Sequence, residues 1–351
     1  MRKMISIICA SAMVMSLAAC SGNSGAGSQN PTGNVTGENA ADKATIVKYS
    51  VVFAANGTQA DGAAALGELI DKHSDGRLKM EFYPSSQLGD KVATFEGLQS
   101  ATIEMTECAA TDLSSFNPMW SVFALPYLWE NGQQAVQTVM DPAVSEVLNA
   151  DAEANGFKII AWTDCGSRNF VNTKRPINTP QDLKGLKIRC MEDTILAESI
   201  NAMGAIATPL AFSEVYTGMQ QGTLDGADYQ LPGIYASGWQ EICKYVSLTE
   251  HFTIPDPVFV SKAWFDRLSP ENQQAILDAG KEFTEQWNKE IWPNATAEAR
   301  ENLEKAGMKI NEVDKEPFST AVQPVVDKFL SDATEQQKEL YDLLTETREK
   351  Y

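Results

Sequence analysis

The chain has 351 residues, and its 47 Asp and Glu outnumber 28 Lys and Arg to give a net charge of −19. An excess of acidic residues this large argues against nucleic acid, heparin or anionic lipid headgroups as partners. The sequence has only two histidines, His73 and His251, and no glycine-rich phosphate loop. A histidine-based metal site or a Ser/His/Asp triad is therefore poorly supported, and we expect no cofactor and no metal.

The first twenty residues have the features of a secretory signal peptide. Arg2 and Lys3 precede the apolar stretch 4–17, which is shorter than the roughly 20 apolar residues of a membrane-spanning helix. The segment then ends in LAAC at 17–20, which resembles the lipobox of bacterial lipoproteins. This resemblance implies lipid attachment at Cys20 and anchoring to the outer face of the cell membrane, or to the periplasmic side in a double-membrane cell. The alternative is an ordinary cleavage site that contains a cysteine.

The region after the signal peptide divides into a tether and a folded body. Residues 21–43 are mostly Gly, Ser, Asn, Thr and Ala, and this composition predicts a flexible tether. Roughly 300 residues follow, which is enough for two domains. The first part of this body alternates between predicted strands and helices, which favours an α/β lobe. The strands are expected at 46–53, 78–84 and 102–110, and the helices at 57–76 and 92–101.

A second α/β run begins at Thr179, a predicted helix N-cap followed by Pro180. Segments 97–107 and 218–228 match in residue type, as do 78–82 and 186–190, and we interpret these matches as an internal repeat. Two facing lobes would place a ligand cleft off the carboxyl ends of their strands, near Arg189 and Asp228. The further elements expected here are a short helix at 179–185, a strand at 186–190, a helix at 195–205, a helix at 214–221 capped by Ser213, and a strand at 223–228.

The C-terminal third predicts helices. One begins at the N-cap Ser269, and helical spacing resumes after Pro293, so we expect a long helix broken near Pro293 that braces both lobes, or else two unrelated surface helices. The predicted fold class is α/β, a two-lobed periplasmic-binding-protein-like fold with a ligand cleft between the lobes and a long C-terminal helix bridging both. The expected boundaries are 1–20 signal peptide, 21–43 tether, 44–165 plus about 252–292 lobe 1, 166–251 plus about 293–330 lobe 2, and 331–351 C-terminal helix.

Four cysteines lie in the body of the chain, widely spaced and without a CxxC pair. In an exported protein they could form disulfides, but buried free thiols are equally compatible with the sequence. These residues are Cys108, Cys165, Cys190 and Cys243.

Five segments together carry a resemblance to a known family. The run GSRNFVNTKRPINTPQDLKGLKIR at 166–189 is followed by PLAFSEVYTGMQQGTLDG at 209–226 and VSKAWFDRLSPENQQAI at 260–276. These three, together with YPSSQLGD at 83–90 and FALPYLW at 123–129, resemble the substrate-binding proteins of tripartite ATP-independent periplasmic (TRAP) transporters. The resemblance covers essentially the whole mature chain in the family's order. It implies two α/β lobes that close on a carboxylate, and delivery of that ligand to a small and a large membrane subunit.

The resemblance also implies particular ligand-binding residues. The family's selectivity arginine maps onto Arg189, and a guanidinium can pair a carboxylate through two parallel hydrogen bonds. Arg168 matches a second arginine that reaches the ligand, although it could instead form a bridge that orders the hinge. Phe212 matches an aromatic residue that covers the ligand, although from sequence alone it could equally be a core residue. Where the family often has DGQENP this chain has DGADYQ, so that Asp228 and Tyr229 replace Glu and Asn.

The departures from the family's pattern bear on the ligand. Where sialic-acid binders carry an additional arginine this chain has Asp112, which disfavours sialic acid. Asp112, Glu107 and Trp162 would suit hydroxyl groups or an apolar face, so we expect a sugar acid such as a uronate, or another hydroxy or dicarboxylic acid. Two other classes remain open. The same receptor could pass its ligand-bound form to a sensor kinase or chemoreceptor. The protein could also be an enzyme, although no cluster of residues identifies a general acid or base.

Overall fold

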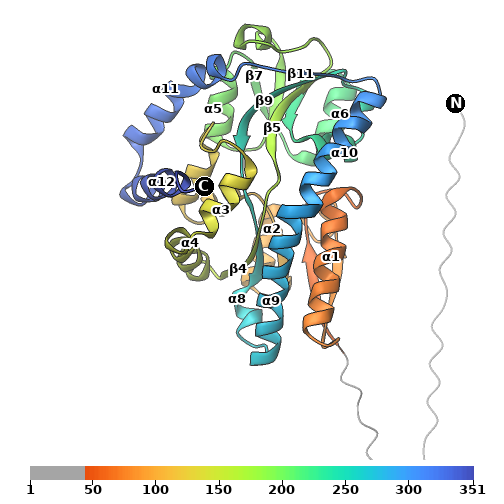
Figure 1. Cartoon of the computed structure of the whole chain (residues 1–351), viewed down its shortest axis with the longest axis vertical. Helices are drawn as coiled ribbons and strands as arrows, with labels where there is room; N and C mark the ends of the chain where they lie inside the picture. Colours follow the sequence, from red (N-terminus) through yellow and green to blue (C-terminus); the bar gives the residue numbers. More distant parts are fainter. Residues whose placement is uncertain (1–43) are drawn as a thin grey trace, which may run out of the picture. The chain divides into compact units, whose positions relative to one another are not determined.

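The computed structural model describes residues 44–351, which form two β-sheets with helices packed around them (Figure 1). We call the five-stranded sheet with its helices lobe 1 and the six-stranded sheet with its helices lobe 2. This architecture confirms the predicted two-lobed α/β fold. The predicted signal peptide, Cys20 and the tether 21–43 lie outside the described residues.

The sheet of lobe 1 has the strand order β2-β1-β3-β10-β4. β1 pairs in parallel with β2 and β3, whereas β10 runs antiparallel to β3 and β4. The carboxyl ends of β1, β3 and β4 and the start of β10 therefore lie at one edge of this sheet. The strands are β1 (Thr45–Ser50), β2 (Leu78–Tyr83), β3 (Met105–Glu107), β4 (Phe157–Thr163) and β10 (Asp256–Ser261).

The sheet of lobe 2 has the order β11-β9-β5-β8-β6-β7. β6 pairs in parallel with β7 and β8, and β5 runs antiparallel to β8 and β9. The strands are β5 (Ser167–Asn172), β6 (Lys187–Cys190), β7 (Ile206–Pro209), β8 (Gly226–Tyr229), β9 (Tyr245–Thr253) and β11 (Lys309–Glu312).

Twelve α-helices and six short helical segments connect these strands within residues 44–351. The α-helices are α1 (Thr58–His73), α2 (Lys91–Gln99), α3 (Gly132–Met140), α4 (Pro142–Ala154), α5 (Thr194–Ala202), α6 (Val215–Gln220), α7 (Leu231–Ala236), α8 (Lys262–Phe265), α9 (Pro270–Gln286), α10 (Trp292–Lys305), α11 (Glu316–Asp332) and α12 (Glu335–Arg348). The short segments are η1 (Ala110–Ser115), η2 (Pro118–Ala124), η3 (Pro180–Leu183), η4 (Phe212–Glu214), η5 (Trp239–Glu241) and the π-helix η6 (Trp287–Ile291).

Two of the three predicted helix starts are confirmed. Ser269 caps α9 by accepting a hydrogen bond from the backbone nitrogen of Asn272, and Thr179 begins the short helix η3. The predicted cap at Ser213 is wrong, because Ser213 lies inside the 3-10 turn η4 and α6 begins after it without a side-chain cap.

The predicted internal repeat is half right. The matching segments 97–107 and 218–228 occupy equivalent places, because each runs from the end of a helix (α2 or α6) into the strand (β3 or β8) beside the central parallel strand. The other match is wrong: 78–82 is β2, at the sheet edge, whereas 186–190 contains β6, whose counterpart in lobe 1 is β1. The two segments share a sequence pattern because both are short parallel strands that follow a glycine turn.

Two of the connections that cross between the lobes join strands and lie side by side. One crossing runs from β4 to β5 through 164–166, and the other runs from β9 to β10 through 254–255. The crossings are joined where Ser167 pairs with Thr253, whose hydroxyl oxygens lie 2.6 Å apart. Gly166 has a φ of +70°, in the left-handed region that favours glycine, and the Trp292 ring lies close to it. These crossings are the natural hinge of the molecule.

One long helical run spans both lobes (Figure 1). α9 packs against α1 and β4 of lobe 1, and α10 packs against α7 of lobe 2. The predicted break near Pro293 is wrong, because residues 270–305 are helical throughout and the π-helix η6 joins α9 to α10. Pro293 lies in the first turn of α10, where its missing N–H and its ring are accommodated by the wider turn that precedes it.

The π-helix is fastened to the first crossing. The Asn288 side chain accepts a hydrogen bond from the backbone nitrogen of Asp164 (2.6 Å) and donates one to the carbonyl of Trp162 (2.9 Å). The Trp287 indole donates to the carbonyl of Asp164 (2.7 Å). The bridging helix and the hinge are therefore one hydrogen-bonded unit.

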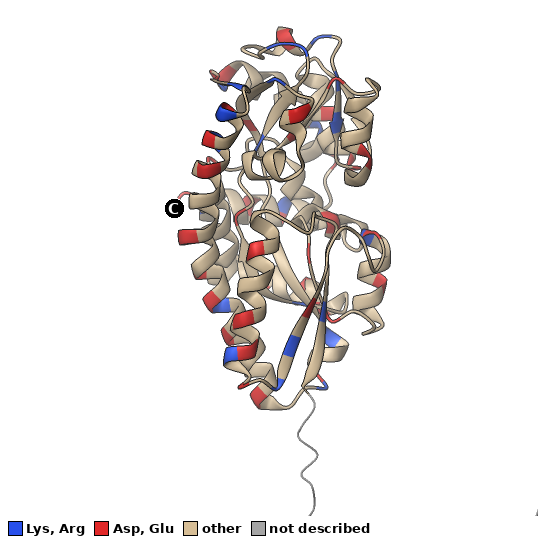
Figure 2. Cartoon of the chain, turned by 90° about the vertical axis from the view of Figure 1, so that its right-hand side faces the viewer, with Lys and Arg blue, Asp and Glu red and all other residues tan. Residues whose placement is uncertain are grey.

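The described part of the chain buries its four cysteines and leaves its surface acidic. Cys108, Cys165, Cys190 and Cys243 are all buried free thiols, so the disulfide alternative does not apply to them. Figure 2 shows acidic residues spread over the helices of both lobes. Across residues 44–351, no helix combines the length and the apolar character needed to cross a membrane.

Candidate functional site

Arg189, near the carboxyl end of β6, presents a buried guanidinium with two uncommitted nitrogens. The residue is 4% exposed, its Nε donates to the carbonyl of Leu210 (2.8 Å), and its Cζ lies 5.9 Å from the centre of the Phe212 ring. Neither terminal nitrogen makes a hydrogen bond or ion pair with any residue in 44–351. Burial, together with the positive charge of Arg168, lowers the pKa of Arg189. An anion at this guanidinium would offset the cost of that burial.

Arg168, on β5, forms a buried ion pair with Asp228 of the neighbouring strand β8. Its Nε donates to the Asp228 carboxylate, and its Nη2 donates to Oδ1 (3.1 Å) and to the Asp228 carbonyl (2.7 Å). Burial alone would raise the pKa of Asp228, but the charge and hydrogen bonds of Arg168, together with the His251 ring whose Nε2 lies 3.8 Å from Oδ2, hold it well below its usual range. Arg168 thus forms a bridge to Asp228 through Nε and Nη2, while its Nη1 makes no hydrogen bond within residues 44–351, and its contact with a ligand stays a prediction.

Three aromatic rings form a wall beside these arginines. The ring centre of Tyr229 lies 5.2 Å from that of Phe212 and 5.4 Å from that of Trp239, and Arg168 Cζ lies 5.2 Å from the Tyr229 ring. Gly233 leaves room for the Tyr229 ring, which a side chain at that position would strike. Burial raises the pKa of Tyr229 to about 12, and no residue in 44–351 accepts a hydrogen bond from its hydroxyl. Tyr229 is therefore a protonated donor available to a ligand.

The carboxyl edge of the lobe 1 sheet brings together several acidic and polar side chains. Glu107 accepts hydrogen bonds at both carboxylate oxygens, from the hydroxyls of Tyr49 (2.6 Å) and Thr163 (2.7 Å). Ligand atoms of Glu107, Cys165 and Asp256 all lie within 4.8 Å of one another. Burial and the charge of Glu107 raise the pKa of Asp256 to about 8.

The same three residues could in principle hold a metal ion, but their chemistry does not favour it. Both oxygens of Glu107 are already engaged, and burial raises the pKa of the Cys165 thiol well above its usual value. A metal needs the deprotonated thiolate as its ligand.

This edge of lobe 1 faces the arginines of lobe 2. The charge of Asp256 raises the pKa of both Arg168 and Tyr229. The side chains of β5 and β8 therefore lie close to the start of β10 in the other lobe. We therefore treat Arg189, Tyr229 and Asp256 as candidate residues of one site.

The comparisons with known proteins agree with this arrangement. The family profile described as "Bacterial extracellular solute-binding protein, family 7" matches residues 49–332. The chain belongs to this family. A solute-binding protein of Chromohalobacter salexigens is 32% identical over 284 residues, which cover 78% of this chain and 81% of the relative.

Solved structures of TRAP periplasmic solute-binding proteins have the same fold. One from Anaerococcus prevotii, with bound D-glucuronate, matches with a TM-score of 0.81 at 29% identity and covers 88% of this chain and 99% of its own. Another, from a Polaromonas species with bound D-erythronate, matches with a TM-score of 0.79 at 30% identity and covers 86% and 98%. Family 7 consists of exported solute-binding proteins of transport systems, not of enzymes.

Two residues that the sequence assigned to this family 7 site already have contacts within the chain, and their contact with a ligand stays a prediction. Both carboxylate oxygens of Asp112 accept hydrogen bonds from Lys91 Nζ, at 2.7 Å each. Trp162 is 5% exposed and packs in the apolar core. The sequence reasoning missed Asp256, whose only signal was its position between Pro255 and Pro257 at the second crossing. That signal has meaning only once β10 is known to lie between β3 and β4.

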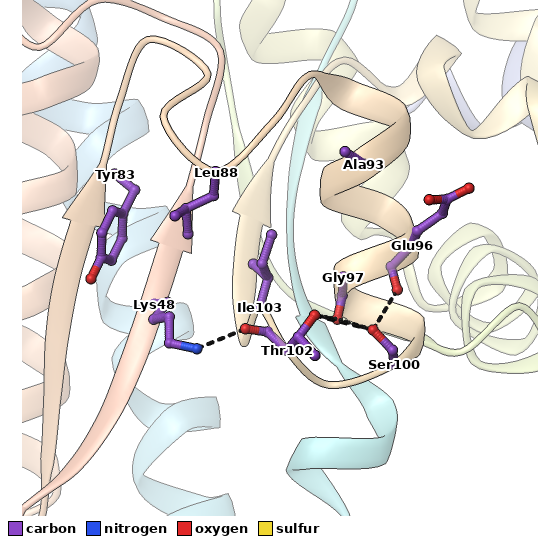
Figure 3. A pocket seen from close by; sticks show the side chains of 9 residues that line it. All are labelled: Lys48, Tyr83, Leu88, Ala93, Glu96, Gly97, Ser100, Thr102 and Ile103. Carbon is purple, nitrogen blue, oxygen red and sulfur yellow. Dashed lines mark hydrogen bonds between the residues drawn. The ribbon is translucent and has the colours of Figure 1, made fainter. Parts of the chain in front are cut away.

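One hollow on lobe 1 is lined by none of the candidate ligand-binding residues. Its volume is about 560 Å³, and it lies between α2 and the strands β1 and β2 (Figure 3). Its polar groups bond to each other, since Lys48 Nζ donates to the Thr102 carbonyl (2.8 Å) and the Ser100 hydroxyl donates to the Glu96 carbonyl (2.8 Å). This hollow therefore gives no support for a ligand site away from the candidate residues.

Proposed function

We propose that this family 7 solute-binding protein captures a small organic acid, a sugar acid or other hydroxy acid, through Arg189. It then delivers this acid to the small and large membrane subunits of a TRAP transporter. The observation that carries the proposal is the buried guanidinium of Arg189, whose terminal nitrogens find no partner in residues 44–351. A carboxylate fits this pair of parallel donors. The relatives with bound D-glucuronate and D-erythronate support the same class of ligand.

The other predicted site residues receive different roles in this proposal. Phe212 and Tyr229 form the wall against which the ligand lies, and Tyr229 donates a hydrogen bond from its hydroxyl. Arg168 and Asp228 are positioning residues, because their ion pair keeps the β5 and β8 ends in place. Asp112 holds Lys91 and does not contact the ligand.

Calorimetric titration of the purified protein tests the proposal. D-Glucuronate and D-erythronate should bind, whereas their neutral analogues D-glucose and erythritol should not. Arg189→Ala should weaken binding by about thirty- to several thousand-fold, because removing one partner of a buried charge pair costs roughly 2 to 5 kcal/mol. Arg189→Lys should restore little, since an ammonium lacks the planar pair of donors. Arg300→Ala, which removes an exposed arginine paired with Glu312, is the matched control and should bind normally. An Arg189→Ala protein that binds within a few-fold of wild type would refute the proposal.

We also propose that Cys20, outside the described residues, carries a lipid that holds the receptor at the membrane. The support is the LAAC motif at 17–20 after an apolar stretch. Cys20→Ser should move the protein from the membrane fraction to the soluble fraction of cells. Unchanged membrane fractionation of Cys20→Ser would contradict lipid attachment at this residue.

A further inference from the structure

Asp256 differs from the other acidic residues at the cleft edge of lobe 1 because its carboxyl has no strong hydrogen-bond donor and no cation as a partner within residues 44–351. Glu107 is held by Tyr49 and Thr163, and Asp112 is held by Lys91. No hydrogen bond to an N–H or O–H donor in residues 44–351, and no ion pair, engages the Asp256 carboxyl. Its nearest polar neighbour is the Cys165 thiol, which is a weak donor. Asp256 therefore keeps its hydrogen-bonding capacity for something that enters the cleft.

The position of Asp256 puts it opposite the anchor for the carboxylate. It is the first residue of β10, where the chain has just crossed from lobe 2, and it follows by three residues Thr253, which pairs with Ser167 beside Arg168. Arg168 is already paired with Asp228, so it offers no second positive charge. A ligand held at Arg189 and lying along the Phe212 and Tyr229 rings would thus turn its far end toward Asp256.

The surroundings of Asp256 restrict what that far end can be. Glu107 lies within 4.8 Å, and a second carboxylate on the ligand would add a further acidic group at an edge where the cation Lys91 is already paired with Asp112. A hydroxyl group carries no charge and can both donate and accept.

We propose that Asp256 is a specificity-determining residue that binds a hydroxyl at the far end of the ligand and excludes a second carboxylate. The ligand class is therefore polyhydroxy monocarboxylic acids and not dicarboxylic acids. This inference rests on the proposed function, in which Arg189 holds the single carboxylate. It adds a contact from lobe 1 and so makes the bound acid a link between the two lobes.

Two pairs of acids test the proposal directly, because within each pair only one terminal group differs. D-Erythronate and meso-tartrate differ by a terminal CH₂OH against a carboxylate, and so do D-gluconate and D-glucarate. Calorimetry with wild-type protein should show the monocarboxylate of a pair binding at least tenfold more tightly. Asp256→Ala should weaken binding of that monocarboxylate at least tenfold. Asp256→Asn, which keeps the shape and the hydrogen bonds, should stay within a few-fold of wild type and should narrow the difference between the two acids.

Controls separate this inference from the proposed function. Asp266→Asn removes an exposed carboxylate of lobe 1 paired with Lys262. It should change neither the affinity for the monocarboxylate nor that for the dicarboxylate of a pair. Circular dichroism and thermal melting of the Asp256 variants show whether they fold. In one outcome, D-glucuronate binding depends on Arg189 while Asp256→Asn and Asp256→Ala leave the ratio of the two affinities within each pair of acids unchanged. That result would overturn only the role of Asp256.

Three other results would also overturn it. These are tighter binding of a dicarboxylate, absence of binding by both pairs, and tighter binding of 4-aminobutyrate than of 4-hydroxybutyrate. The last would show that the acidic edge recognises a cation. Loss of the Arg189 dependence, by contrast, refutes the proposed function itself.

Discussion

Asp228→Asn tests whether the ion pair between β5 and β8 is a structural support of the cleft. Arg168 is 8% exposed and Asp228 is 1% exposed. The change removes the negative charge but almost no volume, so it leaves the Arg168 guanidinium buried beside a neutral amide. We expect Asp228→Asn to lower the free energy of unfolding strongly without removing any group that contacts ligand in our proposal.

The expected magnitude follows from the burial of both partners. Removing one partner of a buried pair costs about 3 to 5 kcal/mol, because the other charge is left without compensation. Urea unfolding of the ligand-free protein, followed by tryptophan fluorescence, should show this loss. The matched control is Glu198→Gln, whose partner Lys328 lies on the surface, and this change should cost at most about 1 kcal/mol. A loss at Asp228→Asn no larger than in that control would refute the reasoning.

The pH dependence gives a second readout of the same pair. The pKa of Asp228 is lowered in the folded protein, so the pair stabilises the fold above the unfolded-state value near 4. This stabilisation is lost as the pH falls below that value toward the folded pKa. Wild type should therefore lose stability on acidification more steeply than Asp228→Asn.

Two further predictions concern the hinge and the acidic edge. Asn288→Ala removes three hydrogen bonds between the π-helix and its surroundings, including those to Asp164 and Trp162, and should lower the free energy of unfolding by roughly 1 to 3 kcal/mol in urea unfolding. The control Asn272→Ala removes the one hydrogen bond that the half-exposed Asn272 side chain accepts from Arg77, and should cost less. The pKa of Asp256 is raised to about 8, so between about pH 4 and pH 8 the folded state binds more protons than the unfolded state. The wild-type protein should therefore lose up to roughly 1 kcal/mol of stability per pH unit as the pH rises through this window. Asp256→Asn should flatten this slope in denaturation measured at several pH values, and an unchanged slope would mean that Asp256 is ionised in the folded protein.

The elements that are encoded locally could be predicted from the sequence. The cap at Ser269 and the turn at Thr179 depend on a few neighbouring residues, so they were found. The π-helix was not, because proline at 293 predicts a break unless the hydrogen bonds of Asn288 and Trp287 to a distant strand are known. The predicted match between 78–82 and 186–190 was wrong for the same reason, because the order of strands in a sheet is a tertiary property.

The candidate site shows the same limit. The resemblance to a family located Arg189, Phe212 and Tyr229, which the structure brings together in lobe 2. It could not reveal that Arg168 is committed to Asp228, because β5 and β8 are sixty residues apart and meet only in the folded sheet. Asp256 was not predicted as a site residue, because a single acidic residue between two prolines forms no recognisable sequence motif.

The charges of the cleft, counted group by group, indicate what the receptor can hold. The Arg168 charge is balanced by Asp228, and that of Lys91 by Asp112, so Arg189 is the one positive charge at this cleft left without a partner among the described residues. Burial raises the pKa of Glu107 and of Asp256, which reduces the negative charge opposite it. The overall excess of acidic residues acts over longer distances and is screened beyond about 8 Å at physiological ionic strength. One unbalanced guanidinium matches one carboxylate on the ligand, and the hydrogen-bonding groups that remain are suited to hydroxyls.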